Sequence, residues 1–212
     1  ENISNHQAMQ IGTAGYTAML CVLGLEDFGI KPDSGEILVT GASGGVGSVA
    51  ISLLSNLGFS VIASTGRLSE TDYLKSIGAS SVIDRSELSE PSKPLGKERW
   101  SAAIDSVGSQ TLSNVIAQTK YGGAVSACGL AQGMDLPSTV LPFILRGVSL
   151  IGIDSVMAPM SKRERAWDRL SKDLNMDKLA EMVVETNLDE IQSFAQLILD
   201  GQVRGRVVVN IS

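Results

Sequence analysis

Residues 37–47 read ILVTGASGGVG, a short apolar run that leads into a turn with four glycines. Apolar residues then recur at helical spacing as far as Gly58, and a second apolar run, VIAS, occupies residues 61–64. Glycines let the backbone turn sharply and approach a pyrophosphate, and the start of the following helix favours phosphate charge. This order of strand, turn, helix and strand predicts a nucleotide-binding unit, the alternative being a turn that is merely tight.

The same alternation continues on both sides of this unit. Apolar periodicity, with glycine or proline stops, predicts helices at 7–29, 73–77, 110–119, 161–174 and 188–199 and strands at 81–83, 102–106, 124–127, 148–153 and 206–211. Strands that alternate with helices form parallel sheets with right-handed crossovers. We therefore expect an α/β chain, a Rossmann doubly wound parallel sheet with helices on both faces.

Charge and hydropathy restrict the partners. The 212 residues include 17 Lys and Arg against 23 Asp and Glu, a formal net charge of −6. Nucleic-acid binding usually needs a basic surface that displaces counterions from phosphates, so we expect no nucleic-acid partner. No apolar run in the sequence approaches the length needed to span a bilayer, so we expect no membrane partner either.

Metal-binding side chains are scarce. The chain has two cysteines, Cys21 and Cys128, and one histidine, His6. These three cannot supply the four nitrogen and sulfur ligands of a tetrahedral zinc site, so we expect no metal. Two separate cysteines indicate a reducing compartment, and we expect a cytoplasmic protein. Because His6 lies in a polar opening segment, it is no candidate for a buried base, and the catalytic residue stays unknown.

The end of the second strand bears on the choice of dinucleotide. An NAD site places an acid there for the ribose 2′-hydroxyl, whereas this chain reads Ser64-Thr65-Gly66-Arg67. Hydroxyls and a guanidinium bind a 2′-phosphate through charge-assisted hydrogen bonds. The sequence therefore favours NADP(H). In the alternative interpretation, Arg67 is a solvated side chain near Glu70 or Asp72.

The glycine pattern fits two classes of dehydrogenase. The spacing of Thr40, Gly41, Gly45 and Gly47 also matches the short-chain fingerprint, whose enzymes carry a Tyr-x-x-x-Lys proton relay. None of the tyrosines at 16, 73 and 121 has a lysine four residues later. A helical segment also precedes the first strand, where short-chain enzymes begin with that strand. Both observations argue against the short-chain class.

Several sequence blocks point to one family. They are AMQIGTAGYTAMLC at 8–21, VTGASGGVGS at 39–48, CGLA at 128–131, LPFILRGV at 141–148, GIDSV at 152–156 and GR at 205–206. Together they resemble the acryloyl-CoA reductase and quinone oxidoreductase-like branch of the medium-chain dehydrogenase/reductase superfamily. The resemblance covers nearly the whole chain, and ordered blocks are more specific than a glycine turn alone. It implies a zinc-independent oxidoreductase that uses NADP(H).

The resemblance also implies contacts to each part of the cofactor. The pyrophosphate would be lined by Ser43, Gly44, Gly45 and Val46, and the 2′-phosphate by Thr65, Gly66 and Arg67, with Ser81 as a further member of that pocket. The nicotinamide half would be approached by Leu130, Ile144 and Ser155, and Gly201 falls where relatives present an asparagine. Leu130 and Ile144 could equally be core residues, and Ser155 could simply end a strand. The strand-end acids Asp105 and Asp154 are interpreted as caps.

By the same resemblance, residues 1–30 form a helix that links to a largely absent N-terminal catalytic domain. Residues 31–200 would be the NADP-binding Rossmann domain, and 201–212 a strand that returns toward the catalytic domain. The implied reaction is hydride transfer from NADPH to an activated C=C bond, in acryloyl-CoA or a similar enone or thioester, by a homodimer. NADPH:quinone reduction is one alternative. A non-catalytic nucleotide sensor or structural domain is an alternative of another class.

Overall fold

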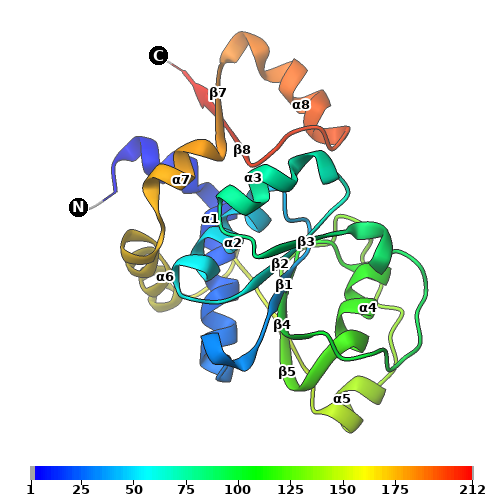
Figure 1. Ribbon diagram of the computed structural model, residues 1–212. Coiled ribbons are helices and arrows are strands. Elements are labelled where there is room, and N and C mark those ends of the chain that lie inside the picture. The colour runs from blue at the N-terminus through cyan, green and yellow to red at the C-terminus, as the bar shows by residue number, and fades with distance from the viewer. Residues whose placement is uncertain (1–2, 212) are drawn as a thin grey trace.

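The computed structural model describes residues 3–211, whose centre is a six-stranded parallel sheet (Figure 1). The strand order is β3-β2-β1-β4-β5-β6. These strands are β1 (Ile37–Val39), β2 (Val61–Thr65), β3 (Ser81–Asp84), β4 (Trp100–Asp105), β5 (Thr119–Ala127) and β6 (Ser149–Gly152). The expected doubly wound α/β fold is confirmed. Residues 1, 2 and 212, at the outer ends of the expected linking helix and closing strand, lie outside the described residues.

Helices connect and cover these strands. The α-helices are α1 (Asn5–Phe28), α2 (Gly45–Asn56), α3 (Thr71–Ser76), α4 (Ser109–Gln118), α5 (Leu141–Arg146), α6 (Met160–Asp173), α7 (Met176–Glu181) and α8 (Ile191–Leu199). Short 3₁₀ turns are η1 (Pro32–Ser34), η2 (Leu68–Glu70), η3 (Arg85–Leu88) and η4 (Leu188–Glu190). The sequence did not lead us to expect α5 or α7.

Alternate strand residues face opposite layers of the fold. Ile37 and Val39 pack in one buried cluster with α1, α2 and α3, whereas Leu38 packs in a second cluster with α4. All three side chains are fully buried. Because both faces of the sheet are covered at its centre, β1 is an unbroken apolar run rather than an alternating pattern.

Helix α1 is the central helix of one face. A capping box of Ser4 and Gln7 starts it, and Gly29 ends it in the left-handed conformation at φ 106°. Contrary to our expectation from the sequence, α1 is long and apolar enough to cross a membrane, with a mean hydropathy of 1.4. However, 67% of that apolar window is buried inside the fold, which is the environment of a core helix.

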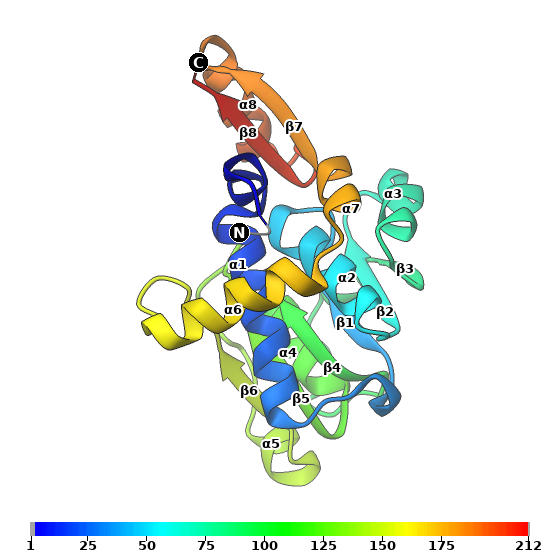
Figure 2. The same ribbon diagram turned by 90° about the vertical axis from the view of Figure 1, so that its left-hand side faces the viewer.

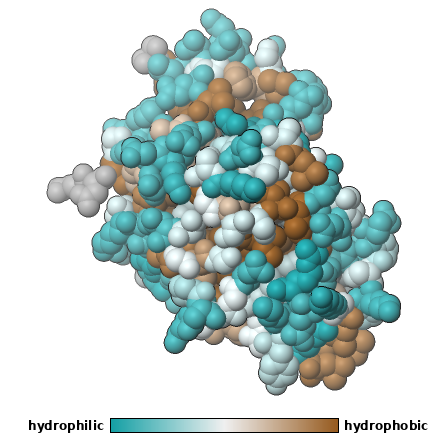
Figure 3. Space-filling model, viewed as in Figure 1, coloured by the Kyte–Doolittle hydropathy of each residue, from teal (hydrophilic) through white to brown (hydrophobic). Residues whose placement is uncertain are grey.

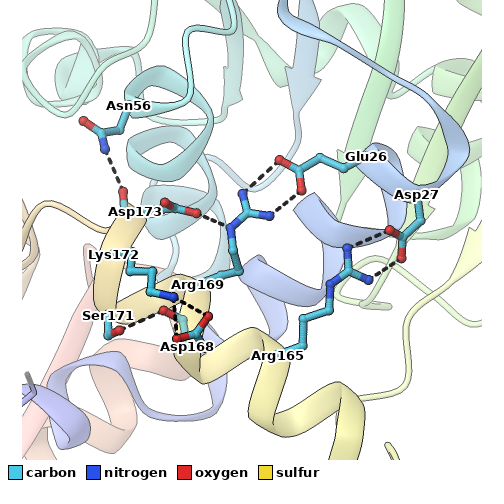
Figure 4. Close-up of polar contacts among 9 residues, drawn as sticks. All are labelled: Glu26, Asp27, Asn56, Arg165, Asp168, Arg169, Ser171, Lys172 and Asp173. Carbon is cyan, nitrogen blue, oxygen red and sulfur yellow. Dashed lines mark hydrogen bonds and ion pairs between the residues drawn. The ribbon is translucent and has the colours of Figure 1, made fainter. Parts of the chain in front are cut away.

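Ion pairs hold α6 across α1 (Figure 4). Arg165 donates to both carboxylate oxygens of Asp27 at 2.7 Å. Arg169 donates to both oxygens of Glu26, at 2.7 and 3.0 Å, and also pairs with Asp173. These contacts raise the pKa of both arginines and lower the pKa of Asp27. The guanidinium groups of Arg165 and Arg169 are thus already matched by carboxylates.

The C-terminal residues form a separate unit. β7 (Val183–Asn187) pairs in parallel with β8 (Arg206–Asn210), and these two strands form a sheet of their own within residues 3–211. With α8 they project from the body of the molecule (Figure 2). The sequence analysis missed β7 and extended the Rossmann domain to residue 200. The pairing of β7 with β8 begins at Val183 and Arg206.

The turn between β1 and α2 offers a test of backbone packing. A Cβ at Gly47 would lie 2.7 Å from the Ala42 Cα and even nearer the Gly41 carbonyl oxygen. We therefore expect Gly47→Ala to lower the free energy of unfolding by about 1–3 kcal/mol, measured by urea denaturation. The control is Gly152→Ala, because a Cβ at Gly152 has nothing within 4 Å. Equal stabilities for the two variants would contradict the packing argument.

Candidate dinucleotide-binding site

The glycine turn lies at the carboxyl end of β1. Gly41 adopts φ 58°, and the Gly44 N–H donates to the Gly41 carbonyl at 2.9 Å. Gly44 is the N-cap of α2, and no side chain caps this helix end. The first N–H groups of α2 therefore remain available to an anion, and the helix dipole favours its charge.

Ser43, Thr65 and Arg67 meet at the junction of this turn with β2. The Ser43 hydroxyl lies 3.2 Å from the Thr65 hydroxyl and accepts a bond of 3.2 Å from the Arg67 guanidinium. Arg67 also donates to the Val203 carbonyl at 3.0 Å. Glu70 pairs with Arg204 instead, at 3.4 Å. The solvated interpretation of Arg67 does not describe this arrangement, because the side chain is fixed by Ser43 and Val203.

Arg85 is a neighbour of this group that the sequence analysis missed. A Cβ at Gly66 would lie 2.5 Å from the Arg85 Nε, so the Arg85 side chain rests on the Gly66 backbone. Within residues 3–211, Arg85 forms no ion pair. Its position directly after β3 was the available signal, because the carboxyl ends of parallel strands share one edge of the sheet.

Ser81, in contrast, is not brought to this group. Ser81 pairs with Ile62, while Asp84 pairs with Thr65 at the carboxyl end of β2. Three residues of strand separate Ser81 from that end, a distance of about 10 Å. The sequence analysis placed Ser81 correctly at the start of a strand. This start is at the amino ends of the strands, away from Thr65 and the glycine turn.

The residues expected near the nicotinamide likewise lie at two different ends of the strands. Leu130 follows β5 and lies next to Gly108, whose Cβ would be 3.2 Å from the Leu130 Cα; Ser155 follows β6. Ile144, 68% exposed, is on α5, whose Arg146 bonds the Ala117 carbonyl just before β5 begins. Ile144 is therefore near the amino ends of the strands, whereas the glycine turn is at their carboxyl ends.

Gly201 follows α8 and adopts φ 66°. This places it in the projecting C-terminal unit, where it is exposed. A Cβ at Gly201 would meet nothing within 4 Å. The structure thus does not bring Gly201 into contact with the glycine turn.

The two strand-end acids hold turns. Asp105 accepts bonds from the Thr40 hydroxyl at 2.6 Å and the Gly108 N–H at 2.8 Å. Burial raises the pKa of Asp105, although these hydrogen bonds oppose the rise. Asp154 accepts from the N–H groups of Val156 and Met157, which lower its pKa. Both acids act as backbone caps, in agreement with their interpretation from the sequence.

Cys21 of α1 and Cys128, just after β5, are far apart in sequence but in contact in the fold. A side-chain interaction with the Cys21 thiol lowers the pKa of Cys128. The same contact, together with burial, raises the pKa of Cys21. Cys128 also lies 3.4 Å from the Asp105 carbonyl oxygen, so the thiol pair borders the sheet edge that carries the glycine turn.

Comparison with known proteins identifies the family. The sequence profile of the zinc-binding dehydrogenases matches residues 45–172, more than half of the chain. The chain belongs to this family.

Other family members resemble it closely. Acrylyl-CoA reductase AcuI of Ruegeria pomeroyi is 51% identical over 213 residues, which cover 100% of this chain and 64% of AcuI. Escherichia coli K-12 YhdH, crystallised with NADPH, has a TM-score of 0.98 and 52% identity, and Bacillus subtilis YhfP, crystallised with NAD, has 0.95 and 46%. Both matches cover 100% of this chain and 65% of the other. The chain thus spans slightly less than two thirds of these relatives.

The family's name implies zinc, but the described side chains do not fit it. Among residues 3–211, no three His, Cys, Asp or Glu side chains lie together where they could hold a metal ion. His6 bonds Glu185 at 2.7 Å, and the two cysteines contact each other. Zinc independence of the whole protein stays a prediction.

The thiol contact predicts a change in reactivity. Cys21→Ala removes the hydrogen bond that lowers the pKa of Cys128, and leaves burial and the Asp105 charge, which both raise it. We therefore expect the rate of Cys128 alkylation by iodoacetamide to rise at higher pH in the variant than in the parent protein. Cys128→Ala is the control for labelling at other sites. An unchanged pH profile would contradict the contact.

Proposed function

We propose that this chain forms the NADP(H)-binding part of a reductase that transfers hydride to an activated C=C bond. The observation that carries the proposal is the group of Ser43, Thr65 and Arg67 beside a glycine turn. It offers hydroxyls and a guanidinium where an NAD site has an acid. The 51% identity to an acrylyl-CoA reductase supports an acryloyl thioester or a similar enone as substrate.

Two arginines support the choice of NADP(H) over NAD(H). Arg67 and Arg85 flank Gly66, and neither forms an ion pair with a carboxylate within residues 3–211. A 2′-phosphate between them would accept charge-assisted hydrogen bonds from both guanidinium groups. Because YhfP was crystallised with NAD, the preference between the two dinucleotides is the property to measure.

The residues of this chain would position the cofactor, which supplies the hydride. The first turn of α2 would bind the pyrophosphate, and Leu130 and Ser155, at the same edge of the sheet, would border the nicotinamide. Hydrogen bonds of Thr40 and Gly108 to Asp105 fix the ends of β1 and β4 between these regions. Hydride would reach the β-carbon of the substrate and a proton its α-carbon. We assign that proton transfer to none of residues 3–211.

Quinone reduction is the second candidate, because YhfP, which is 46% identical to this chain, is provisionally named a quinone oxidoreductase. The test is NADPH oxidation by the intact protein with acryloyl-CoA, a simple enone or a quinone. Faster turnover of the thioester supports the proposal, and faster turnover of the quinone supports the alternative. NADPH binding without turnover of any of them would favour a nucleotide sensor.

Arg67→Gln tests the cofactor site. The variant keeps a hydrogen-bonding amide but loses the charge, so we expect NADPH to bind about 10–100-fold more weakly and NADH to be little affected. Calorimetric titration of the intact protein measures both. Arg165→Gln is the matched control, because Arg165 is paired with Asp27 on another surface. Equal losses for NADPH and NADH would contradict the 2′-phosphate assignment.

We also propose a cytoplasmic homodimer. The contacting thiols, both unbridged, suit a reducing compartment. β6 is an edge strand with Leu150 36% exposed, and Ile144 and Leu145 of α5 are also exposed. Figure 3 shows hydrophobic surface over α5 at the lower right. An open strand edge beside exposed apolar side chains suits pairing with a second copy.

Leu150→Lys tests the dimer. A charge on β6 would be costly to bury, so we expect the variant to sediment as a monomer at concentrations where the parent protein is a dimer. Leu68→Lys is the control, because Leu68 is in η2 near the opposite edge of the sheet and is 51% exposed. A monomeric parent protein, or a Leu150→Lys variant that remains a dimer, would contradict the proposed interface.

A further inference from the structure

One arginine from the C-terminal unit lies beside the glycine turn. A Cβ at Gly45, the first residue of α2, would lie 3.0 Å from the Arg206 Cδ. The Arg206 guanidinium rests against Gly12, where α1 leaves helical geometry with φ 50° and ψ −159°. Gly205, at φ 61°, has no room for a Cβ against the Met182 carbonyl. Three glycines therefore make space for this one side chain and its backbone.

The charge of Arg206 has no carboxylate partner. Within residues 3–211 it forms no ion pair, and its Nε donates to the Gln10 carbonyl at 3.3 Å. Burial lowers the pKa of Arg206, but an arginine remains protonated at neutral pH. A half-buried cation without a counter-charge costs free energy, which a bound anion would offset.

We propose that Arg206 binds the pyrophosphate of the dinucleotide, so that the cofactor is held by both the first turn of α2 and the C-terminal strand. The inference rests on the proposed NADP(H) function and adds a ligand to that site. The Arg206 side chain passes Gly45, the residue where α2 begins, and its guanidinium ends beside Gly12. Phosphate oxygens suit both kinds of donor.

Arg206 is suited to the pyrophosphate rather than to the 2′-phosphate. It lies between the glycine turn and α1, in contact with Gly12 and Gly45. Arg85 instead lies against Gly66, beyond the carboxyl end of β2. Arg67 and Arg85 thus form a pair at the proposed 2′-phosphate position, and Arg206 lies alone at the turn.

Two backbone contacts fix Arg206 in this place. The Gly205 N–H donates to the Ser43 carbonyl at 2.9 Å, and the Arg206 N–H donates to the Met182 carbonyl at 2.8 Å. The start of β8 is thereby attached to the glycine turn itself. A pyrophosphate bound by Arg206 would connect the Rossmann sheet with the projecting unit of β7, α8 and β8.

The test compares two ligands on the intact protein: NADPH, which contains a pyrophosphate, and adenosine 2′-monophosphate, which does not. We expect Arg206→Gln to weaken NADPH about 10–100-fold and to change binding of the monophosphate less than about twofold. Arg206→Lys should recover part of the NADPH affinity, because it restores the charge. Arg85→Gln should weaken both ligands, and Arg99→Gln, paired with Glu87, neither.

Each outcome bears on one claim. Unchanged NADPH affinity in Arg206→Gln overturns the inference, and so does an equal loss for both ligands, which would indicate a structural role at the α1 kink. Thermal unfolding without ligand shows whether the variant is folded, and the shift in midpoint on adding NADPH gives a second measure of affinity. If the parent protein binds adenosine 2′-monophosphate but not NADPH, or neither, the proposed function itself fails.

Discussion

The close approach of α2 to the end of β1 is the constraint on which the site depends. Gly47 packs directly on the backbone of Gly41 and Ala42, so the start of α2 can lie immediately after the strand. This contact determines three features of the site. They are the uncapped helix end, the position of Ser43 opposite Thr65, and the path of Arg206 past Gly45. The arrangement proposed to bind anions is therefore a consequence of missing side chains at a few backbone positions.

Sequence patterns were sufficient for the sheet because its central strands β1, β2 and β4 are buried throughout, and clear glycine stops separate several of its elements. The proximity of Ser43, Thr65 and Arg67 was also predictable, since strand, turn and second strand follow one another directly; their contact with a cofactor stays a prediction. Ser81 and Ile144 were assigned to the cofactor by resemblance, but resemblance alone does not say whether a residue lies at the amino or the carboxyl ends of the strands. Arg85 and Arg206 were missed because their positions depend on neighbours distant in sequence.

Charge is distributed unevenly over this acidic chain. Arg165 and Arg169 are matched by carboxylates of α1, and Arg204 is matched by Glu70. Arg67, Arg85 and Arg206 have no such partner within residues 3–211, and all three lie around the glycine turn or the end of β2. A group of arginines without carboxylate partners favours small anions at that place, whereas the net charge of −6 disfavours extended polyanions.

The parallel pair of β7 and β8 has a consequence for dynamics. Two strands alone make a marginally stable sheet, and α8 beside them has no buried residue. Local opening of this unit should therefore need much less free energy than opening of the central sheet, and its amide hydrogens should exchange with solvent first. Because β8 is attached to the glycine turn through Gly205 and Ser43, protection of these amides would report occupancy of the turn from a distance.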